Sequence, residues 1–337
     1  MRVAVTVEGQ EAVTWADWLA LARVAEDSSI EALFRSDHYS SLAGFPERGA
    51  LDAWGTICGL AAVTRRLRLG TLVSPASFRH PSVLAKLVTT ADHISGGRVE
   101  LGLGTGWSEL EHAAYGFSLL GLRERTDVLA EQLEVIHRSW EGESFDFDGK
   151  HYRLQGLAAR PRPLQSPHPP LILGGSGGPR SCRLAALWAD QYNFDYATLE
   201  QCRERRSKVR AACSEVGRDP DSIGISLMTA CIAAATREEL RARARAALAH
   251  MGSDAGETDD ATDAYLRERQ AEGWIVGTAP EVLEQLRALA EAGVERVMLQ
   301  LFYADLESVR FFGEAIAIAA ADFATPSTEA GSRQDHS

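Results

Sequence analysis

The sequence predicts an α/β fold, a (β/α)8 TIM barrel with insertions, for three reasons. Short β-branched runs alternate with longer amphipathic segments along almost all of the 337 residues, which is typical of βα units around a parallel sheet. Eight such units are present, enough to close a barrel. The first βα turn reads Glu8-Gly9-Gln10-Glu11 and lacks the Gly-x-Gly-x-x-Gly of a dinucleotide-binding open sheet, so the barrel is favoured.

The expected elements follow from hydrophobic periodicity and from the turn residues between them. The expected strands cover residues 3–7, 31–36, 67–72, 99–103, 171–173, 191–194, 223–233 and 297–302. Helices with apolar residues at i, i+3 and i+4 include 15–26, 53–65, 83–94, 123–140 and 280–292. Thr14 with Asp17 predicts an N-terminal cap, and Gly96 and Gly293 predict helix ends.

One domain is expected over residues 1–322. Two stretches do not fit a minimal barrel: 142–170, rich in proline and aromatic residues, and 236–277, a charged helical excursion. We interpret both as insertions that shape a pocket. Residues 323–337 are polar and are expected to form a disordered tail.

Composition excludes several partners. The formal net charge of -12 disfavours nucleic acids and anionic membranes, which require clustered Lys and Arg. Five scattered cysteines, no leader-like start and no apolar run of roughly 18 residues predict a soluble, cytoplasmic protein. The absence of His-Glu-x-x-His and Cys-x2-Cys spacings predicts no metal centre, and the absence of Gly-x-Ser-x-Gly argues against an α/β-hydrolase.

Polar residues gather directly after five of the expected strands. Because the C-terminal ends of the strands form the functional face of such a barrel, these clusters predict an active site on one rim. They are Ser36-Asp37-His38-Tyr39, residues 74–81, residues 104–109 with Trp107 and Glu109, residues 174–180, and Asn193-Phe194-Asp195-Tyr196.

His38 is the first candidate for proton transfer, because the unperturbed pKa of histidine lies near neutrality. The alternative is a structural histidine that hydrogen-bonds a backbone carbonyl. Asp37, the preceding residue, could orient the imidazole, cap a helix or face a cofactor. The sequence leaves these roles open.

The glycine-rich turn after the fifth strand is a candidate anion site. Its backbone N–H groups and the start of the next helix would favour a phosphate, although a tight turn is the alternative. The turn comprises Gly174, Gly175, Ser176, Gly177 and Gly178, and Arg180 follows in the helix.

At these rim segments the chain resembles the luciferase-like monooxygenase superfamily, which includes flavin-dependent monooxygenases and oxidoreductases that use the deazaflavin coenzyme F420. The resemblance covers nearly all of residues 1–320. Its specific segments are 36–39, 69–71, 78–81, 100–107, 173–178 and 276–281.

The resemblance implies a bacterial-luciferase-like barrel with a cofactor site on its rim. Asp37 and His38 would lie by the reactive face of the cofactor ring, and Gly106 and Trp107 would border it. A non-proline cis peptide at Thr71–Leu72, with Val73 beside it, would press on the back of the ring. Residues 174–178 and Arg180 would meet the cofactor phosphate.

The Asp37-His38 pair resembles the F420 branch more than the monooxygenases, whose segment more often reads Glu-His-His. Sugar-phosphate dehydrogenases of that branch carry a catalytic Glu where this chain has Trp107, although Glu109 is close by. An unsaturated or cyclic organic substrate is therefore expected. The leading interpretation is hydride transfer with F420. The alternatives are an FMNH2-dependent monooxygenase and a non-catalytic flavin-binding barrel, and the resemblance implies a homodimer.

Overall fold

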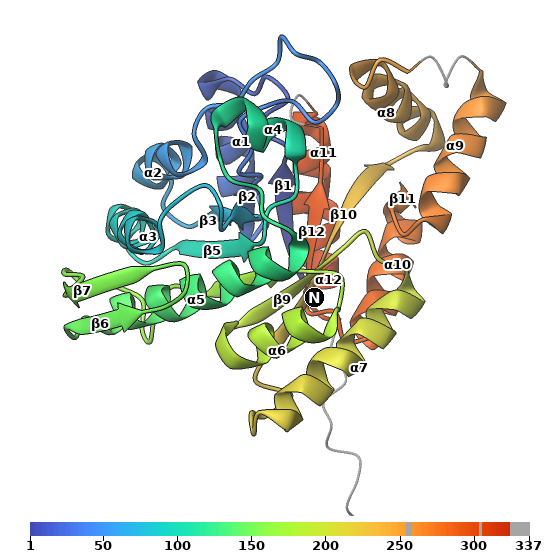
Figure 1. Ribbon diagram of the computed structural model, residues 1–337. Coiled ribbons are helices and arrows are strands. Elements are labelled where there is room, and N and C mark those ends of the chain that lie inside the picture. Colours follow the sequence, from blue (N-terminus) through green and yellow to red (C-terminus); the bar gives the residue numbers. More distant parts are fainter. Residues whose placement is uncertain (254–257, 303–304, 324–337) are drawn as a thin grey trace, which may run out of the picture.

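The computed structural model describes residues 1–253, 258–302 and 305–323. Eight parallel strands close into a barrel in the order β1, β2, β3, β5, β8, β9, β10 and β12, with β12 paired to β1 (Figure 1). The predicted fold is confirmed. The barrel strands are β1 (Arg2–Val7), β2 (Ala32–Arg35), β3 (Arg68–Thr71), β5 (Val99–Gly104), β8 (Leu171–Gly174), β9 (Gln191–Asp195), β10 (Gly224–Ala234) and β12 (Arg296–Gln300).

Helices surround the strands, and their ends follow the local chemistry. The predicted cap forms at α1: the Thr14 backbone N–H donates to Asp17 Oδ2 at 2.9 Å. Helix α3 begins earlier than expected because a proline occupies its first turn. The helices are α1 (Trp15–Glu26), α2 (Ala53–Val63), α3 (Pro81–Ser95), α4 (Glu109–Tyr115), α5 (Leu122–Glu141), α6 (Pro179–Trp188), α7 (Leu199–Glu215), α8 (Arg237–His250), α9 (Asp259–Ala271), α10 (Ala279–Glu291), α11 (Leu306–Phe311), a π-helical turn (Phe312–Ile316) and α12 (Ala317–Ala320).

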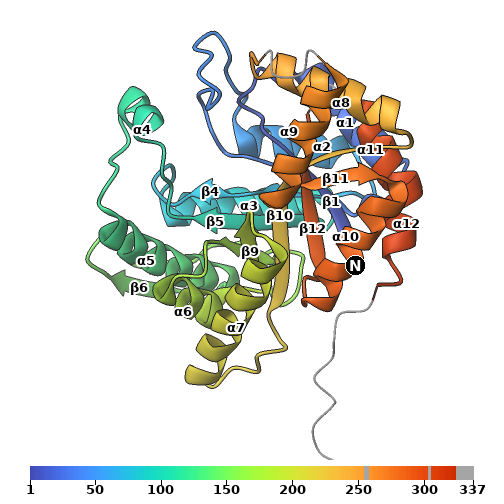
Figure 2. The same ribbon diagram turned by 90° about the vertical axis from the view of Figure 1, so that its right-hand side faces the viewer.

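Both predicted insertions depart from the minimal barrel. Residues 142–170 contain the antiparallel hairpin β6 (Phe145–Asp148) and β7 (Arg153–Leu157), which lies beside α5 (Figure 1). Residues 236–277 contain α8 and α9, which lie on the side of the barrel opposite the hairpin and face the viewer in Figure 2. The expectation that this second segment is helical throughout was wrong at its end, where β11 (Ile275–Thr278) pairs with the outer half of β10. The predicted tail lies, from residue 324 on, outside the described residues.

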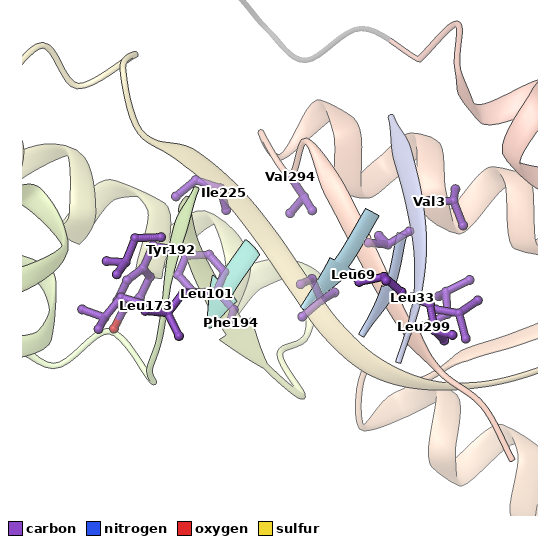
Figure 3. Close-up of a cluster of buried hydrophobic side chains, with 14 of the residues drawn as sticks. Val3, Leu33, Leu69, Leu101, Leu173, Tyr192, Phe194, Ile225, Val294 and Leu299 are labelled. Atoms are coloured by element: carbon purple, nitrogen blue, oxygen red, sulfur yellow. The ribbon is translucent and has the colours of Figure 1, made fainter. Parts of the chain in front are cut away.

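The core has two layers, because successive strand residues point to opposite faces. Val3, Leu33, Leu69, Leu101 and Leu299 belong to the large cluster between strands and helices, part of which Figure 3 shows. A smaller cluster fills the barrel interior with Ala4, Ala32, Phe34, Leu72, Ile172 and Met298.

Below this inner cluster, buried charges close the N-terminal end of the barrel. Arg296 donates from Nη1 to Glu100 Oε2 at 2.7 Å and from Nη2 to Glu100 Oε1 at 3.2 Å. Its Nε also lies 2.9 Å from Glu31 Oε2, and Arg68 pairs with Glu100 from the side. All four residues lie at or beside the starts of β2, β3, β5 and β12. Among the described residues, no helix is long and apolar enough to cross a membrane.

Gly102 permits the close approach of β5 to the end of β3. A Cβ atom at Gly102 would overlap the carbonyl oxygen of Thr71 and would lie 3.1 Å from Val73 Cγ1. We therefore expect Gly102→Ala to lower the free energy of unfolding by about 1–3 kcal/mol, as overpacking does. Urea unfolding of this variant and of Gly49→Ala, where the added methyl meets open space, measures the difference. Equal stability of the two variants would contradict the packing.

Candidate functional site

A cavity of about 1150 Å³ opens at the C-terminal end of the barrel strands. The loops after the strands meet there, as expected for this fold. Among the residues named from the sequence, the cavity lining contains His38, Leu72, Val73, Gly106, Trp107, Gly174, Gly175 and Ser176. It does not contain Asp37, Thr71, Glu109, Gly177, Gly178 or Arg180.

His38 is held by a carboxylate from a distant segment. Its Nδ1 donates to Glu111 Oε2 at 2.7 Å. The other oxygen of Glu111 accepts the backbone N–H groups of Tyr39 and Ser40, so this carboxylate fixes both the ring and the chain that follows it. Because Nδ1 is occupied, Nε2 is the nitrogen of His38 that can serve a bound molecule.

The pair favours a charged imidazole. Burial alone would lower the pKa of His38, but the hydrogen bond and the negative charge of Glu111 outweigh it, so the pKa is raised above its ordinary value. Burial would likewise raise the pKa of Glu111, yet the hydrogen bonds from His38 and from two backbone N–H groups lower it. The pair therefore favours the protonated form of His38, which lies at the wall of the cavity.

Asp37 faces away from the cavity. It is buried, and its Oδ2 accepts hydrogen bonds from Arg79 Nη1 at 2.5 Å and from Ser74 Oγ at 2.6 Å. Arg79 Nη2 also donates a hydrogen bond to Asp52 Oδ2 at 2.6 Å. Asp37 thus ties the end of β2 to the segment after β3, and Glu111 is the residue that orients the imidazole.

The wall formed by Leu72 and Val73 contains the predicted non-proline cis peptide, one residue later than expected. The bond joins Leu72 to Val73, so the prediction of Thr71–Leu72 was wrong by one position. Thr71 still pairs with Arg35 as the last residue of β3, and the chain leaves the regular strand after it.

The glycine-rich turn presents its first half to the cavity. Gly174, Gly175 and Ser176 line the cavity, whereas the Gly177 N–H donates to the Tyr192 hydroxyl at 3.1 Å. Gly178 is the N-cap of α6 and provides no side-chain cap. Because α6 begins at Pro179, which has no N–H, the N–H groups of Arg180 and Ser181 are the first of the helix, and no side chain caps them. The turn is therefore a candidate phosphate site.

Arg180 does not join this turn. Its Nη1 donates to the Arg123 carbonyl oxygen at 2.9 Å, and its guanidinium pairs with Asp127 on α5. The side chain is thus directed to the neighbouring helix, outside the cavity lining.

Trp107 and Gly106 border the cavity next to His38. Trp107 is 61% exposed, and its ring centroid lies 5.8 Å from that of His38 in an edge-on arrangement. Gly106 has φ +77°, and a Cβ there would lie 3.0 Å from Ser77 Oγ, so a glycine is required. Glu109 is an exposed residue in the first turn of α4 and does not line the cavity.

Sequence reasoning missed Glu111 as the partner of His38. The spacing Ser108-x-x-Glu111 is that of a capping box, which hides the second role of the carboxylate. Segment 236–277 shapes the cavity as expected, whereas no described residue of 142–170 lines it. The wall residues from the second segment are Ala242, Arg243, Ala246, Ala247, His250, Met251, Tyr265 and Trp274. In the part of the chain that the structure describes, no group of three His, Cys, Asp or Glu side chains is placed to hold a metal ion.

The sequence matches the family model of the luciferase-like monooxygenases over residues 2–296. A curated relative, the FMNH2-dependent dimethylsulfone monooxygenase of Pseudomonas putida, is 26% identical over 318 residues, which are 88% of this chain and 85% of the relative.

Two solved structures share the fold. An F420-dependent secondary alcohol dehydrogenase in complex with an F420-acetone adduct superposes with a TM-score of 0.76 at 20% identity, covering 96% of this chain and 100% of that one. A monooxygenase from Streptomyces bottropensis superposes with a TM-score of 0.78 at 24% identity, covering 94% and 98%. With the family model matching most of its length, the chain belongs to the luciferase-like monooxygenase family, whose members are oxidoreductases and monooxygenases.

Proposed function

We propose that the protein is an oxidoreductase that transfers a hydride between the deazaflavin coenzyme F420 and a small organic substrate. The observation that carries this proposal is the His38–Glu111 pair at the cavity wall, in which Glu111 binds Nδ1, favours protonation of the ring and leaves Nε2 to a bound molecule. Hydride addition to an unsaturated carbon must be completed by a proton, and a protonated imidazole beside the cavity is suited to deliver it.

The cavity fits a flavin-like coenzyme in three places. The ring would lie against Leu72 and Val73 and beside Gly106, and its phosphate would meet the Gly174–Ser176 backbone, which lines the cavity. When bound, a deazaflavin supplies two-electron hydride chemistry, and its carbon in place of the reactive flavin nitrogen does not support oxygen activation.

The residues of the chain then complete the reaction. The coenzyme would supply the hydride, that is one hydrogen with two electrons, and His38 Nε2 would give the substrate the one proton that completes the reduction. Glu111 keeps the imidazole oriented and charged. Trp107 adds an apolar face next to the histidine, which limits water beside the reacting atoms.

A monooxygenase that uses FMNH2 is the second candidate, because the Pseudomonas putida relative carries that activity. The same cavity would hold reduced FMN. A non-catalytic flavin-binding barrel is disfavoured, because such a protein has no use for a carboxylate that raises the pKa of a histidine at the cavity wall.

Parallel titrations with F420 and with reduced FMN test the proposal. We expect F420 to quench the fluorescence of the tryptophans that line the cavity and to raise the melting temperature, because ligands that bind the folded state stabilise it. FMNH2 should bind more weakly. Preference for reduced FMN would overturn hydride transfer in favour of oxygen chemistry, and binding of neither would revive the non-catalytic alternative.

A further inference from the structure

Some charged side chains of the cavity lining form ion pairs and others do not. Its basic side chains outside the His38–Glu111 pair have neighbours of their own: Arg243 Nε lies 3.9 Å from Asp305 Oδ2, and His250 Nε2 lies 3.3 Å from Arg48 Nη1. Arg48 in turn donates to Glu11 Oε2 at 3.1 Å. Two of the acidic residues of the lining, Asp305 and Glu11, are therefore already neutralised by arginines.

The other two carboxylates of the lining, Glu8 and Asp195, form no ion pair with any residue that the structure describes. Glu8 accepts hydrogen bonds from two neutral amides, Gln300 Nε2 at 2.7 Å and Gln10 Nε2 at 2.5 Å. Arg205 donates to the backbone carbonyl of Asp195 at 3.1 Å, not to its carboxylate. Burial raises the pKa of Asp195, the positive charge of Arg205 opposes this shift, and the nearby carboxylate of Glu8 adds to it.

An aromatic wall adjoins these carboxylates. The Tyr196 hydroxyl donates to Gln300 Oε1, and Gln300 donates to Glu8, so the ring is tied next to that carboxylate. Tyr196, Trp274 and Tyr265 all line the cavity, with centroid distances of 6.3 and 6.4 Å along the series. Tyr196 has a φ of +40°, a conformation that a bulky residue adopts when its surroundings hold it there.

The aromatic wall already contacts one cation from outside the cavity. The Arg269 guanidinium lies 5.4 Å from the Tyr265 ring centroid and 5.9 Å from that of Trp274. Arg269 is not part of the lining and pairs with Glu268 and Glu272. The Tyr196 ring carries no such cation among the described residues and stays available to a ligand.

Asn193 adds a buried acceptor on the same strand face as Asp195. Its side chain is 3% exposed and lines the cavity two residues before Asp195. The amide nitrogen donates to Ser226 Oγ at 2.9 Å, and within the described part of the chain its Oδ1 accepts no hydrogen bond. This corner of the cavity thus offers acceptors and an aromatic face, and no cationic side chain in the described part of the chain forms an ion pair with its two carboxylates.

We propose that the substrate carries a cationic nitrogen, an amine or an iminium group, which binds between the Glu8 and Asp195 carboxylates and the Tyr196 ring. Carboxylates and aromatic faces are the groups that recognise an ammonium-like cation in a desolvated site. This inference rests on the proposed function, because it assigns a substrate class to the same cavity. An anionic group would meet two carboxylates there that form no ion pair with any described residue.

The atoms, protons and electrons of a hydride transfer to such a substrate balance. An iminium carbon accepts the hydride, the C=N double bond becomes a single bond, and the nitrogen is left as a neutral amine. One proton from His38 then yields the ammonium product, while F420 gives up two electrons. In the opposite direction the ammonium group first returns its proton to His38.

Binding of three cyclohexane derivatives to the full-length protein tests the charge preference. Cyclohexylamine is cationic at neutral pH, cyclohexanol is neutral and cyclohexanecarboxylate is anionic, and the fluorescence of the lining residues Trp107 and Trp274 reports their binding. We expect the amine to bind about tenfold more tightly than the alcohol, with the carboxylate weakest. Equal or tighter binding of the alcohol or the carboxylate would overturn the proposal.

Variants separate a specific site from general electrostatics. Asp195→Asn keeps the shape and should reduce the preference for the amine to within about twofold, whereas Glu291→Gln, at an exposed position at the end of α10, should leave it intact. Tyr196→Phe keeps the ring and the preference, and Tyr196→Leu loses it. If Asp195→Asn does not fold, the two Tyr196 variants decide. An unchanged preference in Asp195→Asn or in Tyr196→Leu would refute the site.

The same preparations keep this inference distinct from the proposed function. F420 affinity is measured on each variant alongside the amine. Selective amine binding without F420 binding would remove the proposed hydride transfer and leave the cation site standing. F420 binding without selectivity for the amine would remove the cation site alone.

Discussion

We expect His38→Gln to turn over about 10²- to 10⁴-fold more slowly than the wild type, the usual contribution of a positioned acid or base. Glutamine retains a hydrogen-bonding group for Glu111 but holds no titratable proton at the cavity wall. Steady-state and stopped-flow hydride transfer, followed by the absorbance of the coenzyme, measure the loss. The effect should fall on kcat, because the proposed coenzyme site at Gly174–Ser176 is untouched. Wild-type turnover by His38→Gln would remove this residue from proton transfer.

Glu111→Gln supplies the matched control for the role of the carboxylate. The pKa of His38 is raised, so reduction by the wild type should proceed below this pKa and decline as the pH rises through it. Without the Glu111 charge, burial dominates and lowers the pKa of His38, so the decline should move to lower pH. The same sign holds for stability: the contribution of the pair is complete below the ordinary pKa of 6.5 and is lost as the pH rises through the folded-state value. If Glu111 had only a structural role, the pH profile of turnover would be the same in Glu111→Gln as in the wild type.

The second large effect is expected at the opposite end of the barrel. Glu100→Ala leaves Arg296, which is 1% exposed, with a buried charge and without its bidentate partner. Breaking such a pair from one side costs about 3–5 kcal/mol in the free energy of unfolding. Chemical denaturation of the purified variant measures this loss, and Glu124→Gln, which removes an exposed pair with Lys150, should cost less than about 1 kcal/mol.

The stability of the wild type in acid should depend on the same ion-pair network. Burial would raise the pKa of Glu100, but Arg296 and Arg68 hold it at about 2, below its ordinary value of 4.5. A depressed carboxylate pKa stabilises the fold above pH 4.5 and loses that contribution as the pH falls toward 2. The Glu100→Ala variant should therefore show less acid sensitivity than the wild type. Equal stability of Glu100→Ala and Glu124→Gln at neutral pH would contradict the importance of the network.

The sequence predicted the barrel because its determinants are local. Alternating apolar residues such as Val3 and Val5 place strands between amphipathic helices, and the closed order of the eight strands follows from the right-handed βαβ connection. Strand β11 was not predicted, because its residues show no strand periodicity and it forms through a non-local pairing with the outer half of β10. The cis peptide was misplaced by one residue because the end of the β3 ladder at Thr71 depends on pairing with β2.

The sequence predicted which residues lie at the site better than it predicted their hydrogen-bond partners. The sequence placed His38, Trp107 and Gly174 on one rim, and all three line the cavity. It suggested the neighbour Asp37 as a possible partner of His38, whereas the carboxylate comes from Glu111, 73 residues away. Such a contact depends on the path of the loop after β5, which no local pattern reveals.

The wall formed by α8 and α9 has packing of its own. Ile232, Leu240, Ala244, Leu266 and Val276 form a cluster separate from the two clusters of the barrel. Substitutions on the cavity side of α8 therefore need not disturb the contacts that close the barrel. The shape of the cavity on this side can therefore change with the residues of α8 and α9, while the strand ends that carry His38 and Gly174 keep their own packing.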